Sequence, residues 1–125
     1  MLKSPIRVML VNNEKMIQVG LVEYLSYFDD LIVVSEAQNH IQALEEIHRS
    51  KPDVILLDQD LPDLDGIETT REIHNKFPAP RVIVLSSYYD EDLYQAAIQA
   101  GAVNCILKDV SNNRLLMAIR GGLKA

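Results

Sequence analysis

The 125-residue chain is poor in the features that mark secreted, membrane-bound and nucleic-acid-binding proteins. Its single cysteine, Cys105, excludes an internal disulfide. It has no apolar run long enough to span a bilayer and no charged, apolar leader, so we expect a soluble, cytoplasmic protein without membrane contacts. The 12 Lys and Arg residues are scattered and the net charge is -6, which argues against direct binding of DNA or RNA.

Motifs for zinc and for dinucleotides are also missing. His40, His48 and His74 are far apart and have no Cys or His partner at metal-ligand spacing, so we predict that they are surface residues on helices. No Gly-x-Gly-x-x-Gly occurs, and Gly121-Gly122 is placed to terminate the last helix. A structural zinc site and an NAD site therefore have no sequence support.

What the chain does have is a regular alternation of two kinds of apolar segment. With 48% hydrophobic and 24% charged residues it suits one compact domain with a core and leaves no room for a second. Five β-branched runs of strand length occur, and each is followed by a longer segment of helical periodicity. The predicted strands are Ile6–Val11, Leu31–Val34, Val54–Leu57, Arg81–Leu85 and Val103–Leu107.

In the intervening segments, apolar residues recur every three or four positions, which predicts helices with one buried stripe. The predicted stripes are Ile17, Leu21, Val22, Leu25 and Phe28; Ile41, Leu44 and Ile47; Ile67, Thr70, Ile73 and Phe77; Leu93, Ala96, Ala97 and Ala100; and a last one within Leu115–Leu123. Asp90 and Ser111 are predicted N-caps, and Gly101 is predicted to end the fourth helix.

Five strand–helix units whose strands are apolar on both faces predict an α/β fold. The expected architecture is a single doubly wound five-stranded parallel sheet flanked by five helices. Right-handed crossovers place the carboxyl ends of all strands along one edge of such a sheet, and ligands bind at that edge.

Polar side chains follow four of the five predicted strands at this edge. They are Asn12-Asn13-Glu14 after the first strand, Asp58 after the third, Ser86-Ser87 after the fourth and Lys108-Asp109 after the fifth. We therefore expect a carboxylate, a hydroxyl and an ammonium group from three different strands to meet in one small pocket.

Several of these segments together resemble the receiver domain of bacterial two-component response regulators, over the whole chain. The resemblance rests on residues 54–66 (Val-Ile-Leu-Leu-Asp-Gln-Asp-Leu-Pro-Asp-Leu-Asp-Gly), Val84-Leu85-Ser86, Gly101-Ala102 and Ile106-Leu107-Lys108-Asp109. The Leu-Lys-Asp ending and the Ser-Ser-Tyr-Tyr stretch most resemble the NarL/FixJ group. This resemblance implies a flavodoxin-like fold, with residues 1–125 as the receiver of a longer regulator that continues into a LuxR-type helix-turn-helix domain.

The resemblance also implies the roles of individual residues. Asp58 would be the phosphoacceptor, phosphorylated by a sensor histidine kinase or a small phosphodonor. Lys108 would pair with one phosphoryl oxygen and Ser86 would hydrogen-bond another. Asp58 would also bind Mg²⁺, and Asp60 would lend its backbone carbonyl to the ion. We further expect a homodimer through the first and fifth or the fourth and fifth helices, and contact with DNA only through the output domain.

The same loop contains other residues with a predicted structural role. Pro62 and Gly66 are expected to shape the turn, and Asp63 and Asp65 to solvate it and cap the helix that begins near Ile67.

The chain departs from the family at two places. Asn12 and Asn13 stand where receivers carry two acidic residues that hold Mg²⁺, and a carboxamide supplies oxygen without charge. We predict weak or absent Mg²⁺ binding and slow or absent phosphorylation. Cys105 stands where the family has an aromatic switch residue, and is expected to be an inert, partly buried thiol rather than a redox sensor. Two interpretations stay open: a conventional phosphorylation switch, and a phosphorylation-independent pseudo-receiver that acts through dimerisation or protein interaction.

Two functions outside signalling are weaker. Asp58-Gln59-Asp60 is similar to the Asp-x-Asp of haloacid-dehalogenase-type phosphatases, but that motif follows the first strand and continues to Thr or Val where this chain has Pro62. A flavin carrier would need a Ser/Thr/Gly-rich phosphate loop, and the loop after the first strand reads Asn12-Asn13-Glu14-Lys15. We therefore predict that the chain is not an enzyme.

Overall fold

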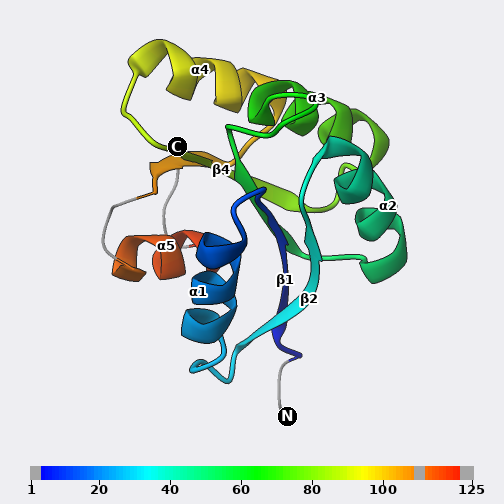
Figure 1. The fold of residues 1–125 in the computed structure, drawn as a ribbon, viewed down its shortest axis with the longest axis vertical. Helices are drawn as coiled ribbons and strands as arrows, with labels where there is room; N and C mark the ends of the chain where they lie inside the picture. Colours follow the sequence, from blue (N-terminus) through cyan, green and yellow to red (C-terminus); the bar gives the residue numbers. More distant parts are fainter. Residues whose placement is uncertain (1–3, 109–111, 122–125) are drawn as a thin grey trace.

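The computed structural model describes residues 4–108 and 112–121 and contains one five-stranded parallel sheet (Figure 1). The strand order is β2-β1-β3-β4-β5, which confirms the predicted doubly wound, flavodoxin-like fold. The strands are β1 (Ile6–Val11), β2 (Leu31–Ala37), β3 (Val54–Asp58), β4 (Arg81–Ser86) and β5 (Asn104–Leu107). Because β3 and β4 extend one residue further than predicted, Asp58 and Ser86 are the last residues of strands rather than loop residues.

Helices cover both faces of the sheet. They are α1 (Lys15–Leu25), α2 (His40–Ser50), α3 (Gly66–Lys76), α4 (Glu91–Ala100) and α5 (Asn112–Ile119). Figure 1 shows α1 and α5 on one face, and α2, α3 and α4 on the other. Strand β3 contributes side chains to the cores on both faces of the sheet. Val54 and Leu56 pack under α1 and α5, and Ile55 and Leu57 pack under the other three helices. Its apolar run is therefore continuous rather than alternating.

Both predicted ends of helix α4 are confirmed. The side chain of Asp90 accepts hydrogen bonds from the backbone N–H groups of the first turn of α4, at 2.8 Å from Asp92 N. Gly101 ends α4 with φ of 114°, and a Cβ at this position would lie 2.5 Å from the ring of His74. Only glycine meets both requirements. The predictions for Asp109, Ser111, Gly122 and Leu123 lie outside the described residues.

One predicted stripe residue, Ile41, is exposed, and Phe28 and Phe77 pack against the core but lie beyond the ends of their helices. Helix α1 ends at Leu25, so Phe28 lies in the following turn, where its ring packs edge-on against Tyr24 at 5.2 Å. Ile41 is 63% exposed, because Ala43 faces the sheet and Ile41 lies roughly 200° around the helix from it. Phe77 caps the end of α3 instead of belonging to it.

The described helices were also compared with the dimensions of a bilayer. In residues 4–108 and 112–121, no helix has both the length and the apolar character needed to cross a membrane.

Candidate functional site

Parallel pairing aligns the carboxyl ends of β3, β4 and β5. Asp58 is the partner of Leu85 across β3 and β4, and Ser86 is the partner of Leu107 across β4 and β5. The ladder continues one step further, because Lys108 N donates to the Ser86 carbonyl at 2.8 Å. The backbones of Asp58, Ser86 and Lys108 therefore end on adjacent strands at one edge, as the sequence predicts.

Asp58 and Lys108 form an ion pair at this edge. Asp58 is 1% exposed, and its Oδ1 lies 2.8 Å from Lys108 Nζ. The same oxygen accepts a hydrogen bond from Asp60 N at 3.0 Å. A buried carboxylate is tolerated only when charge and hydrogen bonds replace its hydration, and here a cation and a backbone amide do so.

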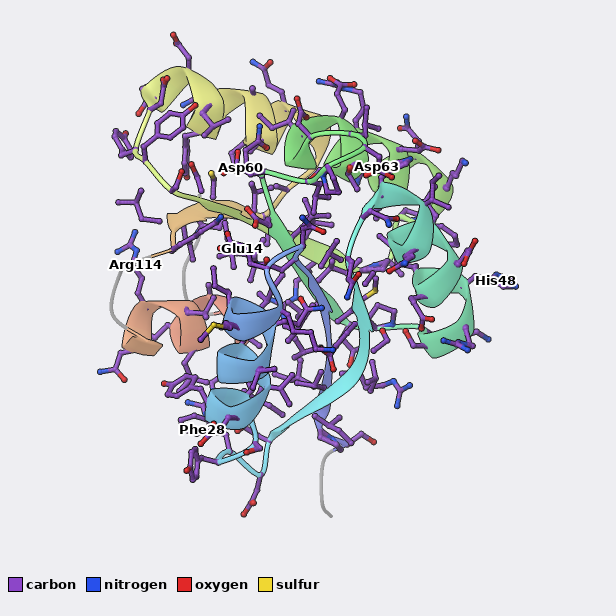
Figure 2. All side chains as sticks on the ribbon, in the orientation of Figure 1. Glu14, Phe28, His48, Asp60, Asp63 and Arg114 are labelled. Carbon is purple, nitrogen blue, oxygen red and sulfur yellow. The ribbon has the colours of Figure 1, made fainter. Side chains whose placement is uncertain are left out.

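Two further carboxylates surround the lysine. Lys108 Nζ lies 3.8 Å from Asp60 Oδ2 and 4.0 Å from Glu14 Oε1, and both of these side chains are more than half exposed. Figure 2 shows Glu14 and Asp60 on the loops that follow β1 and β3, over the same end of the sheet. The sequence alone predicts no role for the Glu14 side chain, and for Asp60 in a receiver it predicts a Mg²⁺ contact through the backbone carbonyl. The signal for Glu14 was its place on the loop after β1, one residue beyond Asn13.

Ser86 reaches the edge, but its hydroxyl is turned to a local partner. Ser86 is buried, and its Oγ donates to the Tyr88 carbonyl at 2.8 Å and accepts from Tyr88 N at 3.3 Å. Within the described part of the chain, no hydrogen bond joins this hydroxyl to Asp58 or Lys108. The structure therefore brings Asp58 and Lys108 into contact and leaves the Ser86 hydroxyl bonded to the turn after β4.

Asn12 and Asn13, at the end of β1, differ from each other in environment. Asn12 is 3% exposed, and its Oδ1 accepts from Glu14 N at 2.7 Å, which closes the turn into α1. The side chain of Asn13 is exposed and makes no hydrogen bond to other described residues. We call Asp58, Lys108, Asp60, Glu14 and Asn12 the Asp58 pocket.

Across residues 4–108 and 112–121, no three His, Cys, Asp or Glu side chains are arranged to hold a metal ion. Asp58 is the only carboxylate buried in the pocket, and Lys108 already neutralises it.

Comparison with known proteins places this geometry in a family. The family model of the response regulator receiver domain matches residues 8–120. This chain belongs to the response regulator receiver domain family. Receiver domains of response regulators interact with sensor histidine kinases and typically use Mg²⁺ for phosphorylation, and response regulators are generally non-enzymatic signal transducers.

The relatives of this receiver are of the NarL/LuxR type. It is 35% identical over 116 residues to the response regulator protein VraR of Staphylococcus saprophyticus, covering 93% of this chain and 56% of the relative. It is 34% identical over 119 residues to the transcriptional regulatory protein LiaR of Bacillus subtilis, covering 95% and 56%. The receiver thus spans little more than half the length of these curated relatives.

A solved structure supports the same assignment. The signal receiver domain of the putative response regulator NarL from Mycobacterium tuberculosis superimposes with a TM-score of 0.86 at 28% identity. The alignment covers 95% of this chain and 99% of that one.

The receiver contains a polar contact between α2 and α3 that corrects the prediction for His40. The His40 side chain is only 12% exposed, with Nε2 at 2.9 Å from Glu72 Oε2 and Nδ1 at 3.2 Å from Thr69 Oγ1. It is therefore not a surface residue, because it joins two helices. His48 and His74 are exposed as predicted, and Figure 2 shows His48 pointing away from the domain.

Asp63 also has a different role from the predicted one. Its Oδ1 accepts from His40 N at 2.9 Å and its Oδ2 from Ile41 N at 3.3 Å, so it caps the start of α2, whereas Asp65 alone caps α3 through Glu68 N at 2.9 Å. Partial desolvation raises the pKa of the Asp63 carboxyl, but these backbone donors outweigh it and the pKa lies below its usual value.

Cys105 is half-buried on β5. Desolvation raises the pKa of its thiol, which disfavours the reactive thiolate. This agrees with the prediction of an inert thiol.

Proposed function

We propose that this chain is the receiver of a NarL/LuxR-type transcription regulator in which Asp58 is the phosphoacceptor but Mg²⁺-assisted phosphorylation is weak. The observation that carries the proposal is the 2.8 Å ion pair between Lys108 and the buried Asp58, next to a β1 end that supplies carboxamides instead of carboxylates. Under this proposal Asp58 is the nucleophile and Lys108 the cation beside it, while the negative charge that would hold a divalent ion is reduced.

The two oxygens of Asp58 are suited to different tasks. Oδ1 is held by Lys108 and by Asp60 N, whereas Oδ2 has no hydrogen-bond partner among residues 4–108 and 112–121. Oδ2 is therefore the oxygen to attack phosphorus. Attack forms the acyl phosphate while the bond from phosphorus to the kinase histidine nitrogen, or to the oxygen of a small acyl phosphate, breaks and its electron pair leaves with that atom.

Lys108 and Ser86 then serve the phosphoryl group. The ammonium of Lys108 already contacts Asp58, so it can pair with the negatively charged phosphoryl group without a large displacement. Ser86 must first release its bond to the Tyr88 carbonyl before its hydroxyl can donate to a phosphoryl oxygen. The turn after β4 therefore has to rearrange when Asp58 is phosphorylated.

The residues present fit Mg²⁺ poorly. Asn12 and Asn13 stand in place of two acidic residues that would attract the ion. For a divalent ion ~5 Å away at an effective dielectric of roughly 20 to 80, each replacement removes about 2 to 7 kcal/mol of Coulomb attraction. Glu14 and Asp60 lie nearby, but their exposure and their proximity to Lys108 weaken any compensation. We infer that the conformational equilibrium of this receiver is set largely without phosphorylation, by sequence and by protein partners.

The regulatory output follows from the same proposal. A DNA-binding domain after residue 125 would account for the length of the relatives, and the receiver would control it through a homodimer. Exposed apolar side chains favour the face of α1 and α5, because Met16 is 88%, Val19 53% and Met117 49% exposed there.

The test is incubation of the chain with acetyl phosphate and Mg²⁺, followed by intact mass measurement. We expect a small, slow gain of one phosphoryl group that is lost in Asp58→Asn. Asp53→Asn, at an exposed aspartate at the opposite end of β3, is the matched control and should leave the gain unchanged. Rapid, complete labelling would contradict the weakened switch, and labelling that persists in Asp58→Asn would contradict the acceptor.

A further inference from the structure

Two of the three methionines in the described part of the chain are exposed, and both lie on the α1 and α5 face of the sheet. Met16 on α1 is 88% exposed and Met117 on α5 is 49% exposed, whereas Met9 on β1 is fully buried. Helices α2, α3 and α4, on the other face, contain no methionine. Figure 1 shows α1 and α5 next to each other, and Ile17 of α1 lines a small cavity together with Leu115 of α5. We call Met16 and Met117 the outer methionines.

The core beneath these two helices is built from other residues. Leu25 of α1 and Leu116 of α5 are buried in it, and neither outer methionine belongs to that cluster. Methionine is among the residue types most often buried, and a flexible, polarisable side chain that stays exposed suits a contact surface. One turn after Met16 the surface is open, because nothing lies within 4 Å of the position of a Cβ at Gly20. A second helix can therefore approach α1 closely along this side.

An exposed thioether is open to oxidation by a hydroperoxide such as hydrogen peroxide. A lone pair of the sulfur attacks one peroxide oxygen, so an S–O bond forms while the O–O bond breaks and its electron pair leaves with the other oxygen. The proton of the attacked oxygen passes to that leaving oxygen, which becomes water. Sulfur is oxidised by two electrons and the peroxide is reduced by two. The resulting sulfoxide is polar where the thioether was apolar, and methionine sulfoxide reductases reverse the step.

We propose that Met16 and Met117 are sites of reversible oxidation through which a peroxide sets the self-association of this receiver. This switch rests on the homodimer through α1 and α5 that belongs to the proposed function. Within such a dimer the outer methionines would be covered, and a covered sulfoxide oxygen loses its hydration unless it finds a donor. Oxidation therefore favours separate receivers. Because the two equilibria are linked, association in turn shields the outer methionines from peroxide.

Other sulfur atoms of the domain are protected from the same oxidant. Met9 is buried on β1 in the core under α2, α3 and α4, so peroxide reaches it only when the chain opens. Cys105 is half-buried, and desolvation raises the pKa of its thiol, which lowers the fraction of the reactive thiolate. The fold should therefore survive a dose of peroxide that converts the outer methionines.

The experiment treats the chain with hydrogen peroxide at millimolar concentration and assigns each added oxygen by peptide mapping and mass spectrometry. Met16 and Met117 should be oxidised at least about tenfold faster than Met9, with thermal unfolding still cooperative. Sedimentation velocity should then give a dimer dissociation constant at least about tenfold weaker than that of the untreated chain. Treatment with methionine sulfoxide reductases of both stereospecificities should restore the original constant.

Two double variants separate oxidation of these methionines from other effects of peroxide. Met16→Leu, Met117→Leu keeps both positions apolar and cannot be oxidised there, so its dimer dissociation constant should not change on treatment. Met16→Gln, Met117→Gln places polar side chains of similar size at both positions and should associate at least about tenfold more weakly than the parent without any peroxide. The matched control, Ile41→Gln, replaces an exposed apolar residue of α2 and should keep the response of the parent to peroxide.

Three outcomes would overturn the proposal: Met9 is oxidised as fast as the outer methionines, oxidation of both leaves the dimer dissociation constant unchanged, or the leucine variant responds to peroxide like the parent. A chain that stays monomeric at every concentration would overturn it as well, together with the homodimer of the proposed function. A dimer that is unaffected by oxidation would contradict the switch alone.

Discussion

The two sides of the Asp58 pocket are held in place by different means and retain different amounts of receiver chemistry. On the β3 and β5 side, Asp58 ends a strand and Lys108 continues a ladder, so backbone pairing brings their charges to 2.8 Å. On the β1 side, Asn12 closes a turn and Asn13 is exposed. The proposed nucleophile and its cation therefore depend on strand pairing, whereas the charge proposed to hold a metal ion depends on the residues of the β1–α1 turn.

The comparison also shows what each side contributes to stability. The Asp58–Lys108 pair has to remain complete, because either partner alone would leave an uncompensated charge in a buried position. The β1 side has no such constraint, since its carboxamides are neutral. Fewer like charges near Asp58 make the unliganded pocket less self-repelling.

The largest loss of stability is expected when the Asp58–Lys108 ion pair is broken. Lys108→Met leaves Asp58 buried without its cation and should lower the free energy of unfolding by about 3 kcal/mol. Adding Asp58→Asn should recover most of this loss, because the unpaired charge is then gone. Urea denaturation of the two single variants and the double variant measures the coupling.

The control for this cycle is Lys76→Met, whose lysine pairs with Glu72 on the exposed surface of α3 at 2.8 Å. It should lower stability by less than about 1 kcal/mol. Equal losses in Lys108→Met and Lys76→Met would contradict the special position of the buried pair.

Restoring charge to the β1 side should sharpen the contrast. The double variant Asn12→Asp, Asn13→Asp should be less stable than the parent in the absence of metal, by about 1 kcal/mol, because the carboxylate introduced in place of Asn12 lies in the Asp58 pocket. Mg²⁺ should then stabilise the variant against unfolding more than the parent, with at least about a tenfold gain in affinity. Denaturation with and without Mg²⁺ measures both effects.

The matched control adds two charges elsewhere, through Asn75→Asp on α3 and Asn113→Asp on α5, both exposed. If this control gains as much stabilisation from Mg²⁺ as the β1 variant, the effect is one of net charge and not of the pocket.

Ser86 should behave as part of the turn after β4 rather than as part of the ion pair. Ser86→Ala removes the hydrogen bonds to Tyr88 and should lower the free energy of unfolding by about 1 kcal/mol. The loss should be the same within about 0.5 kcal/mol when Asp58→Asn is also present. Strong coupling between the two substitutions, measured by urea denaturation, would show that the hydroxyl serves Asp58 before phosphorylation.

The smallest effect is expected at the Asp63 cap. The pKa of Asp63 is lower in the folded chain than the ordinary carboxyl value, so its contribution is fully present above the ordinary pKa of about 3.9 and is lost as pH falls through the lowered folded pKa. Asp63→Asn should therefore destabilise the chain slightly near neutral pH, with a difference from the parent that narrows under acid conditions. Thermal unfolding across this range measures the difference, and a constant gap at every pH would contradict the assignment.

Local sequence patterns were enough to predict the sheet and the approach of Asp58 and Lys108 to each other at its edge. The apolar run of residues 54–57 predicted a strand buried on both faces, and the topology then fixed where Asp58 and Lys108 end. The family likeness supplied the proposed roles, which the fold alone does not give.

What the sequence could not predict depends on contacts between distant segments. The cap that Asp63 provides to α2 arises because the loop after β3 reaches the start of that helix. The contact of His40 with Glu72 joins α2 to α3. The approach of Glu14 to Lys108 depends on the path of the β1–α1 turn. Neither hydrophobic periodicity nor residue type carries this information.

The most direct test of the account is calorimetric titration of the unmodified chain with Mg²⁺ at neutral pH, beside a receiver with a complete acidic site. We predict a dissociation constant at least about tenfold weaker for this chain, because its only buried pocket carboxylate is already paired with Lys108. An equal or tighter dissociation constant would contradict the central claim that the charge for a metal ion is missing from this pocket.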